Sequence, residues 1–368
     1  MLRYNRQSKE MKVLVISFAG IGDSLLITPL TRALSEQLPA ARIDVLVRWP
    51  GARELLQGSP HLHTIFFEES NLAKLRLLWR LRRRHYDISI NAYPQSKIEY
   101  RLIAWFINAY KRLSHRYENY SRIDHKLITL SLDQDYGVHC VQNSLNLLKL
   151  LNLQFPNKTI EPEVFLSADD EQWAGAFLSQ NQLVAKPLLG VHVGSGTTKN
   201  LALKRWPVSH YIQLIRKTLA AEPEIPVLLF GGPEEREANA EILKALESKR
   251  VLMVPSRTIK QATAVLKKCD VFLSVDNLFM HLAAMVKVPQ QIVIESPTFN
   301  KTVEPYHRAY RLVRNPMVAG RNMQYYRFDG RNVQGTTEHL LECMKSISPE
   351  AVFVELQHAL TERRSASG

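Results

Sequence analysis

The sequence predicts an α/β protein built from two doubly wound, Rossmann-like domains that face each other across a cleft. Short apolar runs rich in β-branched residues alternate with amphipathic segments of helical spacing, as in parallel sheets covered by helices on both faces. This alternation weakens between about residues 153 and 186 and then starts again. The chain has 368 residues, 45% of them apolar, which is enough for two separate cores.

The first series begins with the apolar run Lys12–Ser17, a glycine-containing turn and a segment of helical spacing that ends near Leu38. A strand, a loop and a helix are the simplest interpretation. The alternation then continues to about residue 113. Predicted strands cover 42–49, 63–69 and 87–93, and predicted helices cover 71–86 and 96–113.

The second series follows a stretch interrupted by Pro156 and Pro162, where we place the linker. We expect a polar extension, two domains and a final helical segment, over residues 1–10, 11–165, 166–345 and 346–368. In the second domain, predicted strands cover 187–194, 227–232, 250–255, 270–276 and 290–296, and predicted helices cover 208–221, 233–249, 258–269 and 277–287.

Composition argues against several classes of protein. The three cysteines are far apart and lack zinc-ligand spacing, which disfavours a disulfide framework or zinc site and favours a reducing cytosol. Residues 1–10 are polar and no stretch of ~18 residues lacks charge, so we expect neither a signal peptide nor a membrane-spanning helix. The net charge of +13 indicates an anionic partner. Because the basic residues are dispersed and form no nucleic-acid-binding motif, we expect no nucleic acid as partner.

Ligands of doubly wound sheets bind outside the carboxyl ends of the strands, so the loops there form the candidate site. The first loop carries Gly22 and Asp23 where the first helix should begin. Its glycines leave backbone N–H groups open to a ligand, whereas Asp23 either caps the helix or takes part in chemistry. Lys97 follows the strand at 87–93, where it either binds an anionic ligand or is an ordinary exposed lysine.

Two loops of the second domain carry groups suited to a nucleoside diphosphate. Gly194 and Ser195 follow the first strand, and Lys204 and Arg205 then precede a helix. Cations beside a helix N-terminus favour a diphosphate, although a solvated basic turn is the alternative. Glu234 follows the glycines of the next strand, where it either accepts hydrogen bonds from ribose hydroxyls or only favours the helix dipole.

A third loop provides a further candidate anion site. Asp276 and Asn277 lie where a strand turns directly into a helix, so backbone N–H groups should point at a ligand. His281 lies one turn into that helix. A lone histidine on an apolar helix is more often a packed residue than a ligand or a base.

The predicted helix over residues 72–84 is strongly basic. It carries six cations among five leucines and Trp79. It could lie on anionic lipid headgroups, or it could pack its apolar side on the sheet with a solvated basic face. We favour the second interpretation, because basic amphipathic helices are commonly ordinary surface helices.

Taken in order, four motifs resemble the ADP-heptose:lipopolysaccharide heptosyltransferase family, whose members have the two-domain GT-B fold. The resemblance spans roughly Met11 to Tyr306 and depends on the order and spacing of the motifs. The family usually has glycine where this chain has Leu278, and a side chain there restricts approach of a pyrophosphate. The four motifs are KVLVISFAGIGDSLLITPLTRAL, GVHVGSG with KRWP, LLFGGPEE and SVDNLFMHLAA.

The resemblance implies a role for each candidate residue. Asp23 matches the family's proposed general base, and Lys97 lies in the acceptor half. Lys204 matches the lysine that contacts the donor diphosphate, and Glu234 matches the carboxylate that holds the ribose. The donor-binding residues expected on this basis are Gly22, Gly194, Ser195, Lys204, Arg205, Glu234, Asp276, Asn277 and His281, and Lys97 is expected to bind the acceptor.

The implied reaction is inverting, metal-independent transfer of a sugar to a hydroxyl of a lipopolysaccharide core or related glycan, with ADP-heptose as the first candidate for the donor. Asp23 would take the hydroxyl proton, while Lys204 and the N–H groups after Asp276 would stabilise the departing phosphates. No Asp-x-Asp motif stands out in the cleft loops, so we expect no metal cofactor.

The resemblance also implies partners and a location. The expected partners are a nucleotide-sugar donor and an anionic glycolipid or glycan acceptor, with peripheral contact at the cytoplasmic face of the inner membrane. The expected location is the cytoplasm, and the final helix is expected to pack back on the N-terminal domain. The alternatives are a degenerate member that binds nucleotide sugars or acts as a scaffold, and a transferase for another nucleotide sugar or a protein acceptor.

Overall fold

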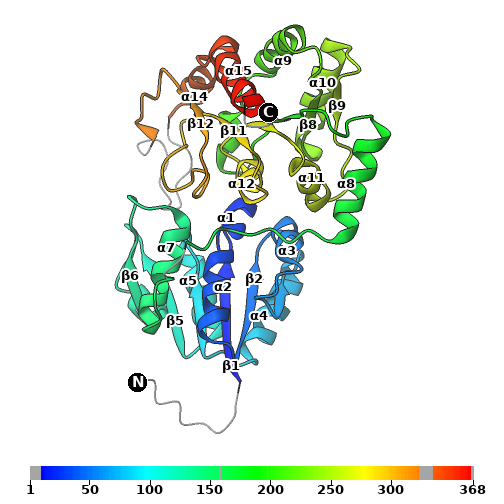
Figure 1. The fold of residues 1–368 in the computed structure, drawn as a ribbon. Coiled ribbons are helices and arrows are strands. Elements are labelled where there is room, and N and C mark those ends of the chain that lie inside the picture. Colours follow the sequence, from blue (N-terminus) through cyan, green and yellow to red (C-terminus); the bar gives the residue numbers. More distant parts are fainter. Residues whose placement is uncertain (1–9, 157–158, 197, 323–334, 366–368) are drawn as a thin grey trace. The chain divides into compact units, whose positions relative to one another are not determined.

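A computed structural model of the protein describes residues 10–156, 159–196, 198–322 and 335–365, which divide into two compact units (Figure 1). The first unit ends at Phe165 and the second begins at Leu166. Each contains a six-stranded sheet whose neighbouring strands are all parallel. The predicted α/β, doubly wound class is therefore confirmed.

The sheet of the first unit has the strand order β3-β2-β1-β4-β5-β6. The order reverses between β1 and β4, and such a switch point is where doubly wound sheets bind ligands. The strands are β1 (Met11–Ser17), β2 (Ala41–Val47), β3 (Thr64–Phe66), β4 (Ile88–Asn91), β5 (Lys111–Arg116) and β6 (Leu130–Asp133). The helices are α1 (Ile21–Leu25), α2 (Thr28–Gln37), α3 (Pro50–Leu56), α4 (Asn71–Arg82), α5 (Ile98–Ile107), α6 (Asp124–Leu127) and α7 (Cys140–Asn146), followed by the 3₁₀ helix η1 (Leu147–Leu151).

One predicted helix of this unit is too long. The helix expected over residues 96–113 ends at Ile107, because Asn108 takes the left-handed conformation, with φ of 60°, and caps it. Residues 111–113 belong instead to β5, which carries three basic residues and a histidine among its six residues. That composition lacks the apolar alternation of a half-buried strand, so the sequence pattern did not indicate it.

Helices α4 and α5 lie next to each other on one face of this sheet and share its core. Their inward side chains are small or aliphatic and pack against β1, where burial of apolar surface favours the folded state by about 25 cal/mol per Å². The core side chains from these three elements are Leu14, Ile16, Leu77, Leu81, Ala104 and Ile107.

The second unit repeats the topology, with the strand order β12-β11-β10-β7-β8-β9. Its switch point lies between β7 and β10. The strands are β7 (Leu189–His192), β8 (Val227–Phe230), β9 (Val251–Met253), β10 (Val271–Val275), β11 (Gln290–Ile294) and β12 (Arg311–Val313). The helices are α8 (Ala168–Gln180), α9 (Val208–Ala221), α10 (Arg236–Leu246), α11 (Ile259–Leu266), α12 (Leu278–Met285), α14 (Thr337–Lys345) and α15 (Pro349–Ser365), with the 3₁₀ helices η2 (Thr198–Lys204) and η3 (Pro233–Glu235).

The last helix corrects one expectation. We expected it to pack on the N-terminal domain, but α15 packs on α9, β11 and β12 within the second unit (Figure 1). Its side chains Val352, Leu356 and Leu360 belong to that unit's core. The physical reason is local, because the indole N–H of Trp206 donates to the carbonyl of Ile347 at 2.8 Å and fixes the start of α15 there.

No helix in the described ranges is long and apolar enough to cross a membrane.

The buried ion pair between Arg101 and Asp124 should be essential to the first unit. Arg101 Nε lies 2.5 Å from Asp124 Oδ1, and both side chains are buried. We expect Asp124→Ala to lower the free energy of unfolding by about 3–5 kcal/mol, because it leaves a buried guanidinium without its counter-ion. Asp133→Ala breaks the exposed pair with Arg116 and should cost less than about 1 kcal/mol. Urea unfolding followed by circular dichroism measures both, and equal losses would contradict the expectation.

Candidate functional site

The switch point of the second unit brings together two residues predicted from the sequence. Lys204 ends η2, in the segment that follows β7, and Asp276 follows the neighbouring strand β10. The ammonium of Lys204 donates to Asp276 Oδ2 at 2.8 Å, and both side chains are buried. A buried ion pair of this kind fixes the direction of a cation that would otherwise sample many rotamers. The charge is thus held at the carboxyl edge of the sheet.

Asp276 is itself held by a third loop. Its Oδ2 also accepts a hydrogen bond from Thr298 Oγ1 at 2.8 Å, and its Oδ1 accepts one from Ser296 Oγ. Both hydroxyls follow β11, the strand next to β10. The sequence pattern did not reveal this role. The available signal was that Ser296 and Thr298 follow a strand adjacent to the one that ends at Asp276.

Asn277 fixes the start of α12. Its Oδ1 accepts the backbone N–H of Met280 at 3.1 Å, so it is the N-cap of the helix. Its amide nitrogen donates to the carbonyl of Gly194 at 2.9 Å. The same side chain therefore caps α12 and holds the loop after β7 beside it. Leu278 is half-buried at the first position of the helix.

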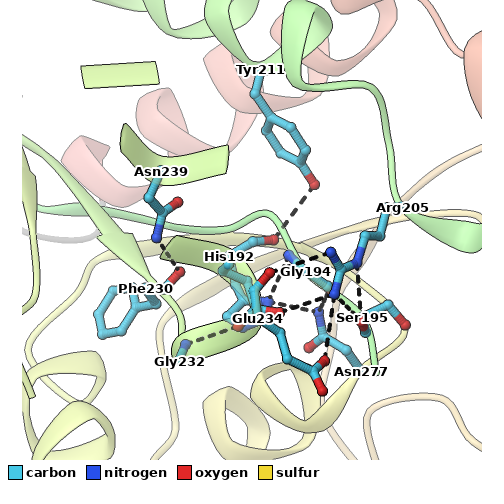
Figure 2. A network of polar contacts seen from close by, with 11 residues as sticks. His192, Gly194, Ser195, Arg205, Tyr211, Phe230, Gly232, Glu234, Asn239 and Asn277 are labelled. Atoms are coloured by element: carbon cyan, nitrogen blue, oxygen red, sulfur yellow. Dashed lines mark hydrogen bonds and ion pairs between the residues drawn. The ribbon is translucent and has the colours of Figure 1, made fainter. Parts of the chain in front are cut away.

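Arg205 ties the loop after β7 to the loop after β8 (Figure 2). Its Nη2 donates to the carbonyl of Ser195 at 2.7 Å and lies 3.5 Å from Glu234 Oε2. Glu234 is exposed, and a carboxylate that faces solvent can accept hydrogen bonds from ligand hydroxyls. The Ser195 hydroxyl is buried and has no hydrogen-bond partner within the described residues. A buried orphan hydroxyl in this loop suits an additional polar ligand.

A second carboxylate, Glu235, is buried beside these loops. Its Oε2 accepts the backbone N–H of Gly232 at 2.8 Å, and burial raises the pKa of its carboxyl above the usual range. A Cβ on Gly194 would lie 2.0 Å from Glu235 Oε1, so any larger residue there would have to displace the Glu235 side chain. From the sequence, Glu235, like Glu234 in the alternative interpretation, was expected at most to favour the helix dipole. Its position three residues after Gly232, at the start of a helical turn, was the signal for a capping carboxylate.

Two buried histidines beside these loops are neutral at physiological pH. Burial lowers the pKa of His192 to about 3. Burial, and then the charge of Lys204, lower the pKa of His281 to about 4. His192 also stacks on Phe279, with 4.4 Å between the ring centroids. The predicted residue His281 therefore lies within the electrostatic reach of Lys204, whereas His192 was not predicted.

In the first unit, Asp23 is a helix-capping residue. Its Oδ2 accepts the backbone N–H of Gly20, the N-cap residue of α1, at 2.9 Å. The structure thus shows the capping interaction that the sequence left open as one interpretation. Asp23 makes it from the third position of α1 and not from the N-cap position. Gly22 precedes Asp23 in α1 and is half-buried. Capping leaves the carboxylate ionisable, so it does not exclude a role in chemistry.

Two tyrosines after β4 feel the charge of this carboxylate. Burial raises the pKa of Tyr93 well above its usual value, and the charge of Asp23 adds to that shift. Burial also raises the pKa of Tyr100; Arg48 opposes this shift and Asp23 adds to it. Arg48 is an exposed cation that follows β2. Tyr93, Tyr100 and Arg48 were not predicted, because no motif distinguishes them in the sequence.

The loop that contains Lys97 is held by buried polar contacts. The backbone N–H of Gln95 donates to the hydroxyl of Tyr117 at 2.7 Å, and the Gln95 amide donates to the carbonyl of Ile16. Lys97 is the half-buried N-cap residue of α5. The structure therefore places Lys97 after β4, the neighbour of the strand that leads to Asp23.

The part of the chain that the structure describes contains no group of three or more histidine, cysteine, aspartate or glutamate side chains arranged to hold a metal ion. Among the described residues, Lys204 and Arg205 are cations that these loops hold by side-chain contacts.

Two doubly wound units in one chain are the architecture of glycosyltransferases of GT-B fold, and comparison with known proteins places the chain in this class. The profile of glycosyltransferase family 9 (heptosyltransferase) matches residues 74–326. This match covers more than half of the chain, and the chain belongs to that family.

Relatives and solved structures agree with this assignment over nearly the whole length. Lipopolysaccharide heptosyltransferase 2 of Salmonella typhimurium is 26% identical over 96% of this chain and 99% of its own. The E. coli ADP-heptose lps heptosyltransferase II structure has a TM-score of 0.72 at 22% identity, covering 96% of this chain and 100% of its own. A glycosyl transferase family 9 structure from Veillonella parvula has a TM-score of 0.74 at 18% identity, with coverages of 96% and 97%. These structural likenesses show the fold.

The neutral histidines make the second unit sensitive to acid. An unfolded histidine takes up a proton near pH 6.5, whereas folded His192 does so only near pH 3. Unfolding therefore takes up a proton between these values, so stability falls as the pH falls. We expect His192 alone to remove about 2 kcal/mol between about pH 7 and pH 5. Urea unfolding at the two pH values should show this loss, and His192→Gln should reduce it.

The matched control is His358→Gln, which changes an exposed histidine of the same unit. This variant should keep the pH dependence of the wild type. A pH dependence that is the same in His192→Gln and wild type would contradict the assignment.

Proposed function

We propose that this protein transfers heptose from ADP-heptose to a hydroxyl of the lipopolysaccharide core, with inversion at the anomeric carbon and without a metal. The observation that carries the proposal is the cationic switch point at which Asp276 holds Lys204. It is supported by the names of the relatives, which describe heptosyltransferases acting on lipopolysaccharide. In this proposal residues 11–165 bind the acceptor and residues 166–345 bind the donor.

The donor site uses the loops of the second unit. Lys204 and Arg205 face the diphosphate, together with the first N–H groups of α12, which a helix N-terminus offers to anions. The buried hydroxyl of Ser195 gains the partner that it lacks within the described residues. Glu234 accepts hydrogen bonds from the ribose hydroxyls. Gly194 and Asn277 keep these loops in place. His281 remains neutral beside Lys204, so it does not repel the Lys204 ammonium.

The chemical step depends on Asp23. Its carboxylate takes the proton of the acceptor hydroxyl as the oxygen attacks the anomeric carbon and the bond to the leaving phosphate breaks. ADP departs with the electron pair, and Lys204 stabilises the charge that develops on it. Gly22 places the backbone of the same turn near the donor, and Lys97 binds an anionic group of the acceptor. No metal is needed for charge stabilisation when cations and N–H groups are already oriented.

The acceptor also determines where the protein acts. A lipopolysaccharide core is anchored in a membrane by its lipid, so the protein works in the cytoplasm with peripheral contact at the inner membrane. The net charge of +13 supports attraction to such an anionic surface.

Asp23→Asn tests the base. Asparagine can still accept the Gly20 N–H, so α1 stays capped while the ionisable group is lost. We expect transfer to fall by about 10²- to 10⁴-fold with ADP affinity unchanged. Asp170→Asn is the matched control, because Asp170 accepts the N–H of the N-cap residue Ser167 from the same third position in α8, and it should keep full activity. Wild-type turnover by Asp23→Asn would show that Asp23 is not the base.

Lys204→Ala tests the phosphate site. Loss of a charge-assisted contact should weaken ADP binding by about 10- to 100-fold in calorimetry. Because the single variant leaves Asp276 without its cation, Lys204→Ala with Asp276→Asn separates phosphate binding from stability. Lys217→Ala, an exposed lysine of α9, should bind ADP as the wild type does. Unchanged affinity in both Lys204 variants would place the phosphates elsewhere.

A further inference from the structure

The first unit has an unusual concentration of exposed apolar side chains. Twelve large hydrophobic side chains are exposed in the described residues, and seven of them lie between residues 72 and 110. Isolated exposed apolar residues are normal, but a contiguous group marks an interaction surface.

Three of these side chains form a stripe along α4. Leu72, Leu75 and Trp79 are 59%, 58% and 53% exposed, and their spacing of three and four residues puts them on one face of the helix. Leu77 and Leu81 of the same helix are buried in the core. The stripe is therefore additional to the face that packs on the sheet.

Helix α5 continues the stripe. Leu102 and Trp105 are 42% and 49% exposed, whereas Ala104 and Ile107 are buried. The two helices pack against each other, and the rings of Trp79 and Phe106 meet edge to face at 5.2 Å. We call the exposed side chains Leu72, Leu75, Trp79, Leu102 and Trp105 the α4–α5 apolar face.

Cations border this face. Residues 71–84 carry six lysine and arginine side chains and no acidic one. Arg82 and Arg84 are used within the fold, where they contact the carbonyl of Phe106 and the carboxylate of Asp44. Lys74, Arg76 and Arg83 are exposed, and within the described part of the chain they make no ion pair.

We infer that the α4–α5 apolar face docks on a bilayer that contains anionic phospholipid. Leucine and tryptophan side chains enter the boundary between headgroups and acyl chains, and the cations beside them contact the phosphates. Charge complementarity selects this occupant, because each unpaired cation near an anionic membrane surface favours binding. The inference deepens the proposed function, since it names the surface that brings the protein to a lipid-anchored acceptor.

The first measurement is co-sedimentation of the full chain with vesicles. Vesicles of phosphatidylcholine with phosphatidylglycerol should bind the wild type, and phosphatidylcholine alone should bind it weakly. Binding should weaken as salt is added, because the charges are exposed. Lipids brominated in the acyl chain should quench tryptophan fluorescence, and Trp79→Phe with Trp105→Phe should abolish that quenching.

Replacing the aliphatic part of the face tests the apolar contribution. Leu72→Ser with Leu75→Ser should weaken vesicle binding by about tenfold or more, because two exposed leucines no longer leave water. The matched control is Val184→Ser with Leu341→Ser. These residues are 63% and 48% exposed in the second unit, and their replacement should leave binding unchanged.

Charge reversal tests the electrostatic contribution. Arg76→Glu with Arg83→Glu should weaken binding by at least about 30-fold and reduce its salt dependence. The control is Lys244→Glu with Lys268→Glu, which makes the same change in net charge at exposed sites of the second unit and should bind close to wild type. A similar loss in the control would mean that net charge alone causes adsorption, and the inference would then be wrong.

Transfer to a deacylated, water-soluble acceptor separates this inference from the proposed function. All face variants should transfer to it at the wild-type rate. If the wild type binds vesicles but transfers nothing, the proposed function fails and the docking surface stands. If the wild type ignores vesicles, the docking surface is overturned. A dimer lost in Leu72→Ser with Leu75→Ser would then assign the face to a second copy of the chain.

Discussion

In the second unit, one buried carboxylate joins three loops by hydrogen bonds. Asp276 follows β10 and accepts hydrogen bonds from Lys204, which follows β7, and from Ser296 and Thr298, which follow β11. Each donor would be costly to bury alone, and each is satisfied by the same two oxygens. The position of the cation is therefore a property of the sheet edge as a whole. A parallel sheet makes this possible, because the ends of β7, β10 and β11 lie side by side at the same edge.

In the first unit, a different carboxylate, that of Asp23, stabilises a short helix. The helix α1 has only five residues, which is too short to be stable by itself. Asp23 stabilises its first turn by accepting the Gly20 N–H. The group proposed to take the acceptor proton is thus positioned in part by the backbone of its own turn. In the proposed mechanism, one residue has both a structural and a chemical role, which explains why position in the sequence alone could not separate them.

The sequence indicated the fold well and the site in part. Apolar runs such as 271–275 identified most strands, because strands buried on both faces have a clear signature. The basic strand β5 and the three-residue strand β12 escaped, since neither has a periodic pattern. Motifs pointed to Lys204 and Asp276 separately, yet their pairing needed the adjacency of β7 and β10. Glu235 and His192 act through burial and hydrogen bonds, which one sequence does not show.

The tight contact between Gly194 and Glu235 limits how this region can vary in evolution. Any side chain at position 194 would displace Glu235. The backbone N–H of Gly232 would then lose its acceptor, and Arg205 would lose a carboxylate partner. Such a change disturbs two loops at once, so a compensating second substitution would have to appear on a different strand–helix connection. Among related chains, we therefore expect substitutions in the exposed parts of each loop, whereas the glycine at position 194 and the glutamate at position 235 should be retained together.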